Sequence, residues 1–175
     1  MPGSIKIDDG SGNYTILTNA GSLGSDKTLT IPNETATLAT TTDVNALGTW
    51  QDWTPTLTNA TQGNGTITAR YVQIGKLVVG MFTFTLGSTS AISGDVNITL
   101  PVTGATTFVN LASLSFIENG VKDVKGFPIL NTTVAYLRAQ KASTTYVENA
   151  TLSSSVPFTW GTGDVISLGF SYEAA

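Results

Sequence analysis

The sequence predicts an all-β protein in which an N-terminal stem of two β-hairpins precedes a β-sandwich head of the jelly-roll kind. Charged residues make up only 11% of the 175 residues, and threonine is abundant, whereas the helix formers Lys and Glu are sparse. Apolar residues make up 41% of the chain, which is too much for a disordered protein. Short runs of alternating apolar and polar residues, separated by Gly, Ser and Asn clusters, are typical of half-buried strands.

The first element is a hairpin near the N-terminus. Residues 4–7 alternate with a period of two, residues 8–12 form a Gly-rich turn, and residues 13–18 resume the alternation. The acidic turn could in principle bind Ca²⁺, but it lacks the ligand spacing of an EF-hand loop. A hairpin turn whose glycines adopt positive φ is the favoured interpretation, and no metal site is predicted.

A second hairpin and a short neck complete the predicted stem, which spans residues 1–48. Residues 27–31 and 36–40 are predicted to pair around a Pro-Asn turn. A single helical turn capped by Thr42 or Asp43 is predicted to end at Gly48. The few apolar side chains of the stem cannot form a core alone. Identical copies can supply the missing surface, so the stem predicts an oligomer.

The head is predicted over residues 49–175 and contains longer strands. Its interior is expected to come from the most apolar runs, which are 78–86, 134–138 and 165–170. A two-sheet sandwich with Greek-key connections fits such strands, although the sequence does not establish their order. The predicted strands are 54–58, 65–73, 76–86, 95–100, 108–118, 129–140, 145–152 and 164–172.

Composition argues against an enzyme. The chain has no histidine and no cysteine, which removes the commonest general base, the usual nucleophile arrangements and His- or thiolate-based metal sites. Two carboxylates could still serve a glycosidase, but the acidic residues are spread thinly along the chain. We therefore predict a non-enzymatic protein without a cofactor.

Charge argues against nucleic acid and membranes as partners. The net charge is −4 and the basic residues are scattered, whereas nucleic acid and anionic membranes attract clustered Lys and Arg. The sequence contains neither a secretory leader nor an apolar run of membrane-spanning length. Synthesis in a cytoplasm is therefore expected.

The aromatic loop 157–163 has two interpretations. Trp160 could stack, together with Phe158, on a sugar of a host glycan, since aromatic residues combine a large contact area with a polar handle. Alternatively, the loop plugs one end of the sandwich.

Four phrases of the sequence stand out. One lies in the predicted stem, Leu29-Thr30-Ile31-Pro32-Asn33-Glu34-Thr35-Ala36-Thr37-Leu38-Ala39, and three lie in the predicted head, Trp50-Gln51-Asp52-Trp53-Thr54-Pro55-Thr56-Leu57, Arg70-Tyr71-Val72-Gln73-Ile74-Gly75-Lys76 and Leu100-Pro101-Val102. Together they resemble the virion-surface proteins of tailed bacteriophages, namely trimeric tail fibres, head fibres and capsid decoration proteins. The resemblance spans residues 28–102, and beyond them only the general β pattern is similar. It implies a homotrimeric, virion-mounted, non-catalytic protein.

Two positions on a virion are compatible with this resemblance. The first is a capsid decoration or cement protein on the capsid exterior, whose stem contacts the major capsid protein and whose head faces outward. We favour it because the first residues already belong to the stem, whereas a tail fibre usually begins with a docking module. The second is a short tail fibre that contacts tail proteins and binds host surface glycans through loops near 87–94 and 158–163. A free, monomeric carbohydrate-binding module is the alternative from another class.

The residues expected to contact sister copies or the capsid come from the stem and from its junction with the head. Trp50 and Trp53 are expected to be buried at the junction or between subunits. The full set is Ile5, Ile7, Tyr14, Ile16, Leu29, Ile31, Leu38, Trp50 and Trp53.

Overall fold

The computed structural model describes residues 4–8, 10–12, 14–18, 47–105, 111–143 and 145–175. The chain divides into two compact units, Met1–Leu38 and Ala39–Ala175, and each is described by itself. Every regular element among the described residues is a β-strand, which confirms the all-β prediction. These residues include no helix long and apolar enough to cross a membrane.

The N-terminal unit contains one antiparallel hairpin. Strands β1 (Ser4–Asp8) and β2 (Tyr14–Thr18) pair across the turn that the sequence predicted. Gly10 and Gly12 in that turn have φ of 79° and 84°, a conformation that glycine adopts at no steric cost. The second predicted hairpin lies outside the described residues, as does the predicted helical turn up to residue 46. Gly48, at the end of that turn, has φ of 80°.

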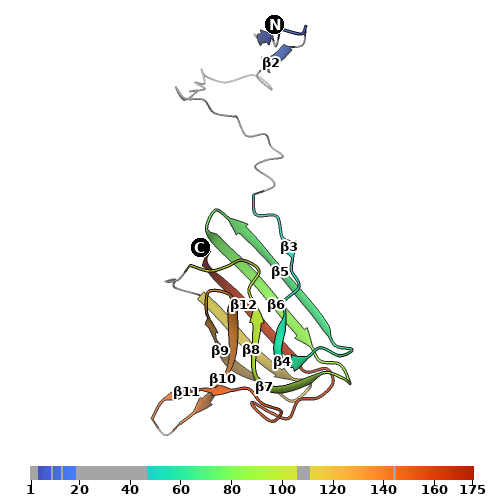
Figure 1. Ribbon diagram of the computed structural model, residues 1–175, viewed down its shortest axis with the longest axis vertical. Helices are drawn as coiled ribbons and strands as arrows, with labels where there is room; N and C mark the ends of the chain where they lie inside the picture. The colour runs from blue at the N-terminus through green and yellow to red at the C-terminus, as the bar shows by residue number, and fades with distance from the viewer. Residues whose placement is uncertain (1–3, 9, 13, 19–46, 106–110, 144) are drawn as a thin grey trace. The chain divides into compact units, whose positions relative to one another are not determined.

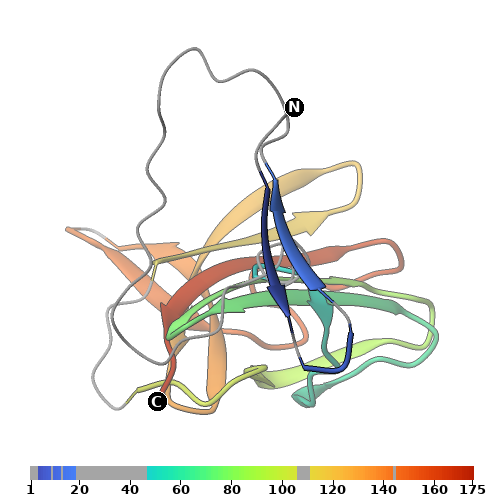
Figure 2. The ribbon, with the colours of Figure 1, turned by 90° about the horizontal axis from the view of Figure 1, so that it is seen from above.

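The head is a single curled antiparallel sheet that forms a half-barrel (Figures 1 and 2). The hydrogen-bonded order is β3-β5-β6-β12-β8-β9-β10-β7-β4, and β11 pairs with β10 beside this path. The strands are β3 (Gln51–Asp52), β4 (Leu57–Thr61), β5 (Thr66–Ile74), β6 (Leu77–Thr85), β7 (Ala91–Thr99), β8 (Leu111–Glu118), β9 (Lys122–Leu130), β10 (Val134–Ala142), β11 (Val147–Thr151) and β12 (Val165–Glu173).

The predicted two-sheet, jelly-roll-like sandwich is not confirmed, because the ladder continues without interruption from β12 through β8 and β9 to β10. Strand β9 was not predicted from the sequence, and its last residues fall within the strand predicted at 129–140. The structure breaks that predicted strand at a turn in which Asn131 N donates to Val134 O (2.8 Å). Residues 91–94, expected in an exposed loop, instead begin β7.

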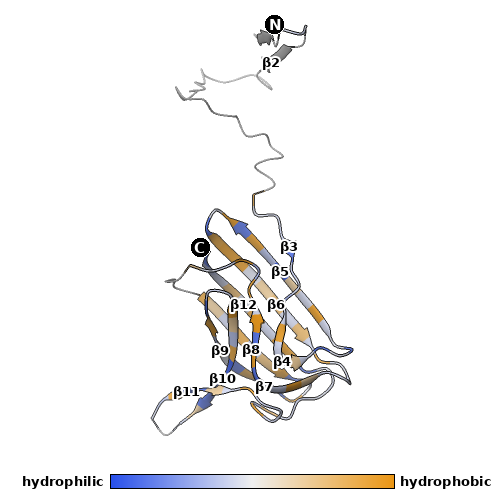
Figure 3. Cartoon of the chain, viewed as in Figure 1, coloured by the Kyte–Doolittle hydropathy of each residue, from blue (hydrophilic) through white to orange (hydrophobic). Residues whose placement is uncertain are grey.

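The core lies on the inner side of the curl. Every second residue along a strand points to this side, and most of these side chains are buried. On β6 the buried residues are Val78, Phe82 and Phe84, and Figure 3 shows hydrophobic and hydrophilic residues alternating along the head strands. Phe170 on β12 packs over Gly80 of β6. A Cβ at position 80 would lie 2.3 Å from Phe170 Cζ, so the glycine makes room for the ring.

The segment that enters the head contributes a strand to each edge of the sheet. Its first strand, β3, pairs with β5 at one end, and its second strand, β4, pairs with β7 at the other. Between them, Trp53 N donates to Ala69 O on β5 (3.1 Å) and Trp53 Nε1 donates to Thr99 O on β7 (3.2 Å). One short segment thus keeps the sheet curled.

Candidate functional site

The outward face of the sheet carries a group of large apolar side chains at the end where the chain enters the head. We call this group the entry patch. It lies opposite the buried residues of the same strands, and four of its members are among the most exposed large apolar side chains described: Leu111 (75%), Leu77 (53%), Ile74 (50%) and Met81 (46%). The entry patch consists of Val72 and Ile74 on β5, Leu77, Val79 and Met81 on β6, and Leu111 on β8.

Cross-strand register makes the entry patch contiguous. Leu77 is opposite Ile74, and Val79 is opposite both Val72 and Ser171. Ser171 is in turn opposite Leu111. Directly opposed side chains on one sheet face are about 5 Å apart at Cβ, so these residues form two adjacent rows. Met81 lies in the next row, where it is opposite Arg70 and Gly169.

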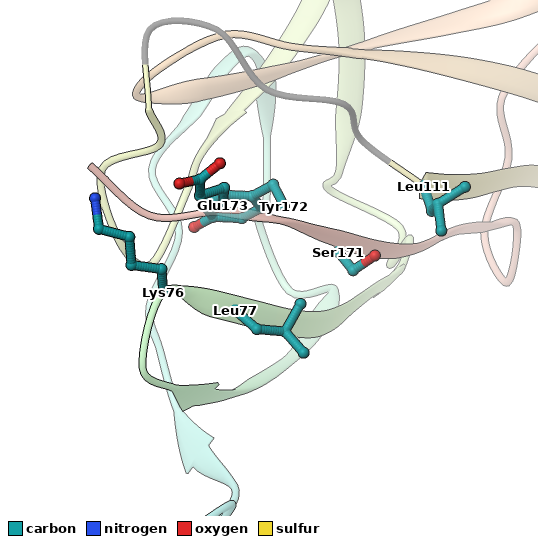
Figure 4. Close-up of a pocket in the computed structure, with 6 residues that line it drawn as sticks. All are labelled: Lys76, Leu77, Leu111, Ser171, Tyr172 and Glu173. Carbon is teal, nitrogen blue, oxygen red and sulfur yellow. The ribbon is translucent and has the colours of Figure 1, made fainter.

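The entry patch contains a shallow hollow of about 450 Å³, which Figure 4 shows. Leu77 and Leu111 line it, and Ser171 of β12 lies on the strand between them. Lys76 and Glu173 stand at one end of the hollow, so opposite charges border an apolar floor.

The same outward face becomes polar toward the other end of the strands. Most of the exposed or half-buried side chains there carry hydroxyl groups, and the half-buried Val165 and Ile117 lie among them. On β5, β6 and β8 the large, exposed apolar side chains are therefore concentrated at the entry end of the face. The hydroxyl residues are Thr66, Thr68, Thr83, Thr85, Ser115 and Ser167.

The backbone that enters the head lies against the entry patch. A Cβ built on Gly48 would be 3.4 Å from Ile74 Cδ1 and 3.7 Å from Val72 Cγ2, which is van der Waals contact. The entry patch and the start of the head are thus adjacent.

Beneath the hollow, Tyr172 fixes the segment that follows β7. Its hydroxyl donates to Val102 O (2.6 Å) and accepts from Val102 N (3.3 Å). Burial raises the pKa of Tyr172 to about 12, although the hydrogen bond with Val102 acts in the opposite direction. The phenol is therefore a structural group that stays protonated at neutral pH.

This pKa predicts a loss of stability in alkali. From pH 10 to about 12 the unfolded phenol ionises while the folded one keeps its proton, so the free energy of unfolding should fall by up to ~1.4 kcal/mol per pH unit. Tyr172→Phe should lack this component, while losing ~1 kcal/mol at all pH values because the hydrogen bonds are absent. Urea unfolding of both proteins over this range tests it. Parallel curves would contradict the assignment.

At the opposite end of the strands, Asp164 joins two loops to the end of β6. It is 4% exposed. Its Oδ1 accepts from Asn119 N (2.9 Å) and its Oδ2 from Gly161 N (2.7 Å). Its backbone carbonyl accepts from Leu86 N (2.8 Å). The carboxylate thus acts as a structural acceptor.

An ion pair lies across β7, β10 and β11. Arg138 Nη1 is 2.7 Å from Asp95 Oδ1, and Arg138 Nη2 donates to Oδ2 at 2.8 Å. The Nη1 group also donates to Thr151 Oγ1 (2.8 Å). This bidentate pair ties three strands together. No group of three or more His, Cys, Asp or Glu within the described ranges could hold a metal ion.

The aromatic loop predicted either to plug the fold or to bind a glycan lies against the core. Phe158 is 5% exposed, and Trp160 packs edge-on against Phe116 with centroids 5.9 Å apart. Trp160 Nε1 donates to Ser153 O (2.9 Å) and Val156 O (3.3 Å). Both aromatic side chains therefore hold the loop to its own head.

The two tryptophans at the start of the head differ in environment. Trp53 packs edge-on against Tyr71 (6.5 Å) and Phe170 (5.7 Å), inside its own head. Trp50 is 37% exposed and remains accessible to another molecule.

The other predicted contact residues belong to the N-terminal unit. The register places Ile5 and Ile7 opposite Leu17 and Thr15, and places Ile16 and Tyr14 opposite Lys6 and Asp8. The predicted residues of β1 and β2 are therefore not cross-strand partners of one another. Leu29, Ile31 and Leu38 lie outside the described residues.

The entry patch was not predicted from the sequence. The signal for it is the run 77–79, where consecutive apolar residues break the alternation and leave β6 apolar on both faces. Comparison of the chain with protein-family models, with curated proteins and with solved structures finds no match.

Proposed function

We propose that this chain is a non-enzymatic, homotrimeric structural protein of a tailed-bacteriophage virion, and that it acts as a capsid decoration protein. Its N-terminal stem would contact neighbouring copies of the major capsid protein and its head would face outward, on the exterior of the capsid. The phrases shared with phage virion-surface proteins support the virion assignment. The trimeric, stem-bearing form and a jelly-roll relationship of the head are part of this proposal.

The observation that carries the proposal is the entry patch. Large apolar side chains rarely gather on the solvent face of a monomeric domain, and where they do they usually mark an interaction surface. A protein whose role is to associate needs such a surface, and here it lies beside the segment that leads from the predicted stem.

The proposed mechanism is thermodynamic. A protein that binds the assembled shell but not free coat subunits stabilises the shell by mass action. Three stems on one trimer would each make a weak contact, and the contacts would reinforce one another through their high effective concentration. No cofactor takes part.

The full chain should therefore sediment at about three times its 18.2 kDa mass. A species near 18.2 kDa would support the carbohydrate-binding module instead. For the position on the virion, the measurement is the copy number in purified particles by stained gel. Decoration requires hundreds of copies and a tail fibre only a few. Electron microscopy of particles made without this chain should then show bare positions on the capsid surface.

A further inference from the structure

The geometry points to the entry patch as the contact between the heads of neighbouring copies of this chain, rather than a contact with the coat protein. This inference rests on the proposed oligomer. It specifies which face of the head forms the contact between copies and which end of that face stays exposed to solvent.

The first argument is position. Gly48 lies in contact with Val72 and Ile74, so the entry patch is within a few residues of the point at which the chain reaches the head. If copies associate through their N-terminal segments, the chain that joins each segment to its head holds these ends of the heads near one another. It thereby raises the effective concentration of one head near the next. The hydroxyl-bearing end of the same face is farther from Gly48, where the chain reaches the head.

The second argument is shape. Between Leu77 and Leu111 the sheet surface is formed by Ser171, and Gly169 follows one pair farther along β12. Such small residues let another backbone approach closely, while the larger side chains on either side supply the apolar area. A hollow bordered by projecting leucines can receive the same leucines from a second copy.

The third argument is charge. The chain as a whole carries a net charge of −4, so two copies repel on average. Around the entry patch, however, Arg70 is paired with Asp52 (3.0 Å), and Lys76 stands beside Glu173 at the hollow. Cations and anions therefore balance at this rim. Two acidic copies can approach here without the repulsion that they meet elsewhere, and Lys76 of one copy can face Glu173 of the next.

The test exploits the absence of cysteine from the sequence. Single substitutions Leu77→Cys and Met81→Cys place a thiol in the entry patch of the full chain. Thr68→Cys places one on the same outward face at its hydroxyl-bearing end and is the matched control. Each variant is labelled with a bulky maleimide, natively and in urea, and is also treated with a short bismaleimide cross-linker.

We expect the native thiols at positions 77 and 81 to react about tenfold or more slowly than the thiol at position 68, and all three to react alike in urea. We also expect cross-linked species from the two entry-patch variants and none from Thr68→Cys.

Three outcomes would overturn the inference. Equal native reactivity in a protein that sediments as a trimer would show that the heads meet elsewhere, while leaving the proposed function intact. Protection that appears only on assembled particles would assign the entry patch to the coat protein. A monomeric mass for the unsubstituted chain would remove both the inference and the proposed oligomer.

Discussion

Replacement of Trp53 by alanine should lower the free energy of unfolding by ~3–5 kcal/mol, the range for removing a large aromatic side chain from a packed site. The ring contacts both Tyr71 and Phe170 edge-on, so its loss leaves a cavity beside two aromatic side chains. The variant also loses the hydrogen bond from Nε1 to Thr99 O, which joins the entering segment to β7. Since domains are typically stable by ~5–15 kcal/mol, this change should be severe.

Trp50→Ala is the matched control, because it removes the same side chain three positions earlier from a site that is 37% exposed. It should cost less than ~1 kcal/mol. Trp53→Phe keeps an aromatic ring but no N–H donor, and should cost an intermediate amount. Urea denaturation at one fixed protein concentration measures all three, since association would otherwise shift the midpoint. Equal losses at positions 50 and 53 would refute the role of Trp53 in holding the sheet curled.

Replacement of Asp164 by alanine should lower the free energy of unfolding by ~2–5 kcal/mol. The carboxylate accepts from two backbone N–H groups, those of Asn119 and Gly161. Each N–H left unsatisfied costs ~1–3 kcal/mol when it remains shielded from water. The loss should also be local, because these two bonds hold the β8–β9 turn and the loop before β12 against the end of the sheet.

Amide hydrogen exchange provides the specific readout. Exchange at Asn119 and Gly161 should accelerate in Asp164→Ala, and less so in Asp164→Asn, which keeps one acceptor oxygen. Asp123, an exposed aspartate on β9, supplies the control: Asp123→Ala should change the free energy of unfolding by less than ~0.5 kcal/mol. Unchanged exchange at both amides in Asp164→Ala would show that the loops are held by other contacts.

These two tests measure the stability of the head and not the association between copies. Trp53 and Asp164 stabilise one head by itself, whereas the entry patch is exposed in that head and is proposed to act only when copies associate. A variant at Leu77 or Met81 should therefore leave the stability of the head largely unchanged while altering association. Receptor binding through Phe158 and Trp160 would require side chains that the head already uses to hold its own loop.

Several strands follow directly from the sequence pattern. The predictions at 65–73, 76–86 and 164–172 lie within a residue or two of β5, β6 and β12, because these runs are rich in apolar and β-branched residues and Gly or Asn turns bound them. The hairpin of β1 and β2 was predictable for the same reason, since Gly10 and Gly12 mark its turn.

Strand β9 could not be predicted from local pattern. Its exposed residues Lys122, Asp123 and Lys125 are charged, and Gly126 and Pro128 are poor strand formers. Tertiary packing overrides those preferences. A Cβ at Gly126 would lie 2.6 Å from Phe116 Cε2, so glycine is required there, and Pro128 lies beyond the last pair of the β8–β9 ladder, where its missing N–H is better tolerated.

Composition and short-range periodicity suffice to show that this chain is built of strands and where most of them lie, because both properties are local to each segment. Only the tertiary structure decided that the head strands form one curled sheet, that Trp53 and Trp160 serve their own head, and that Val72, Ile74, Leu77, Val79, Met81 and Leu111 form a single surface. The physical reason is that alternation tells which residues of a strand share a face, whereas the order and register of strands distant in sequence determine which faces adjoin and which side remains exposed to solvent.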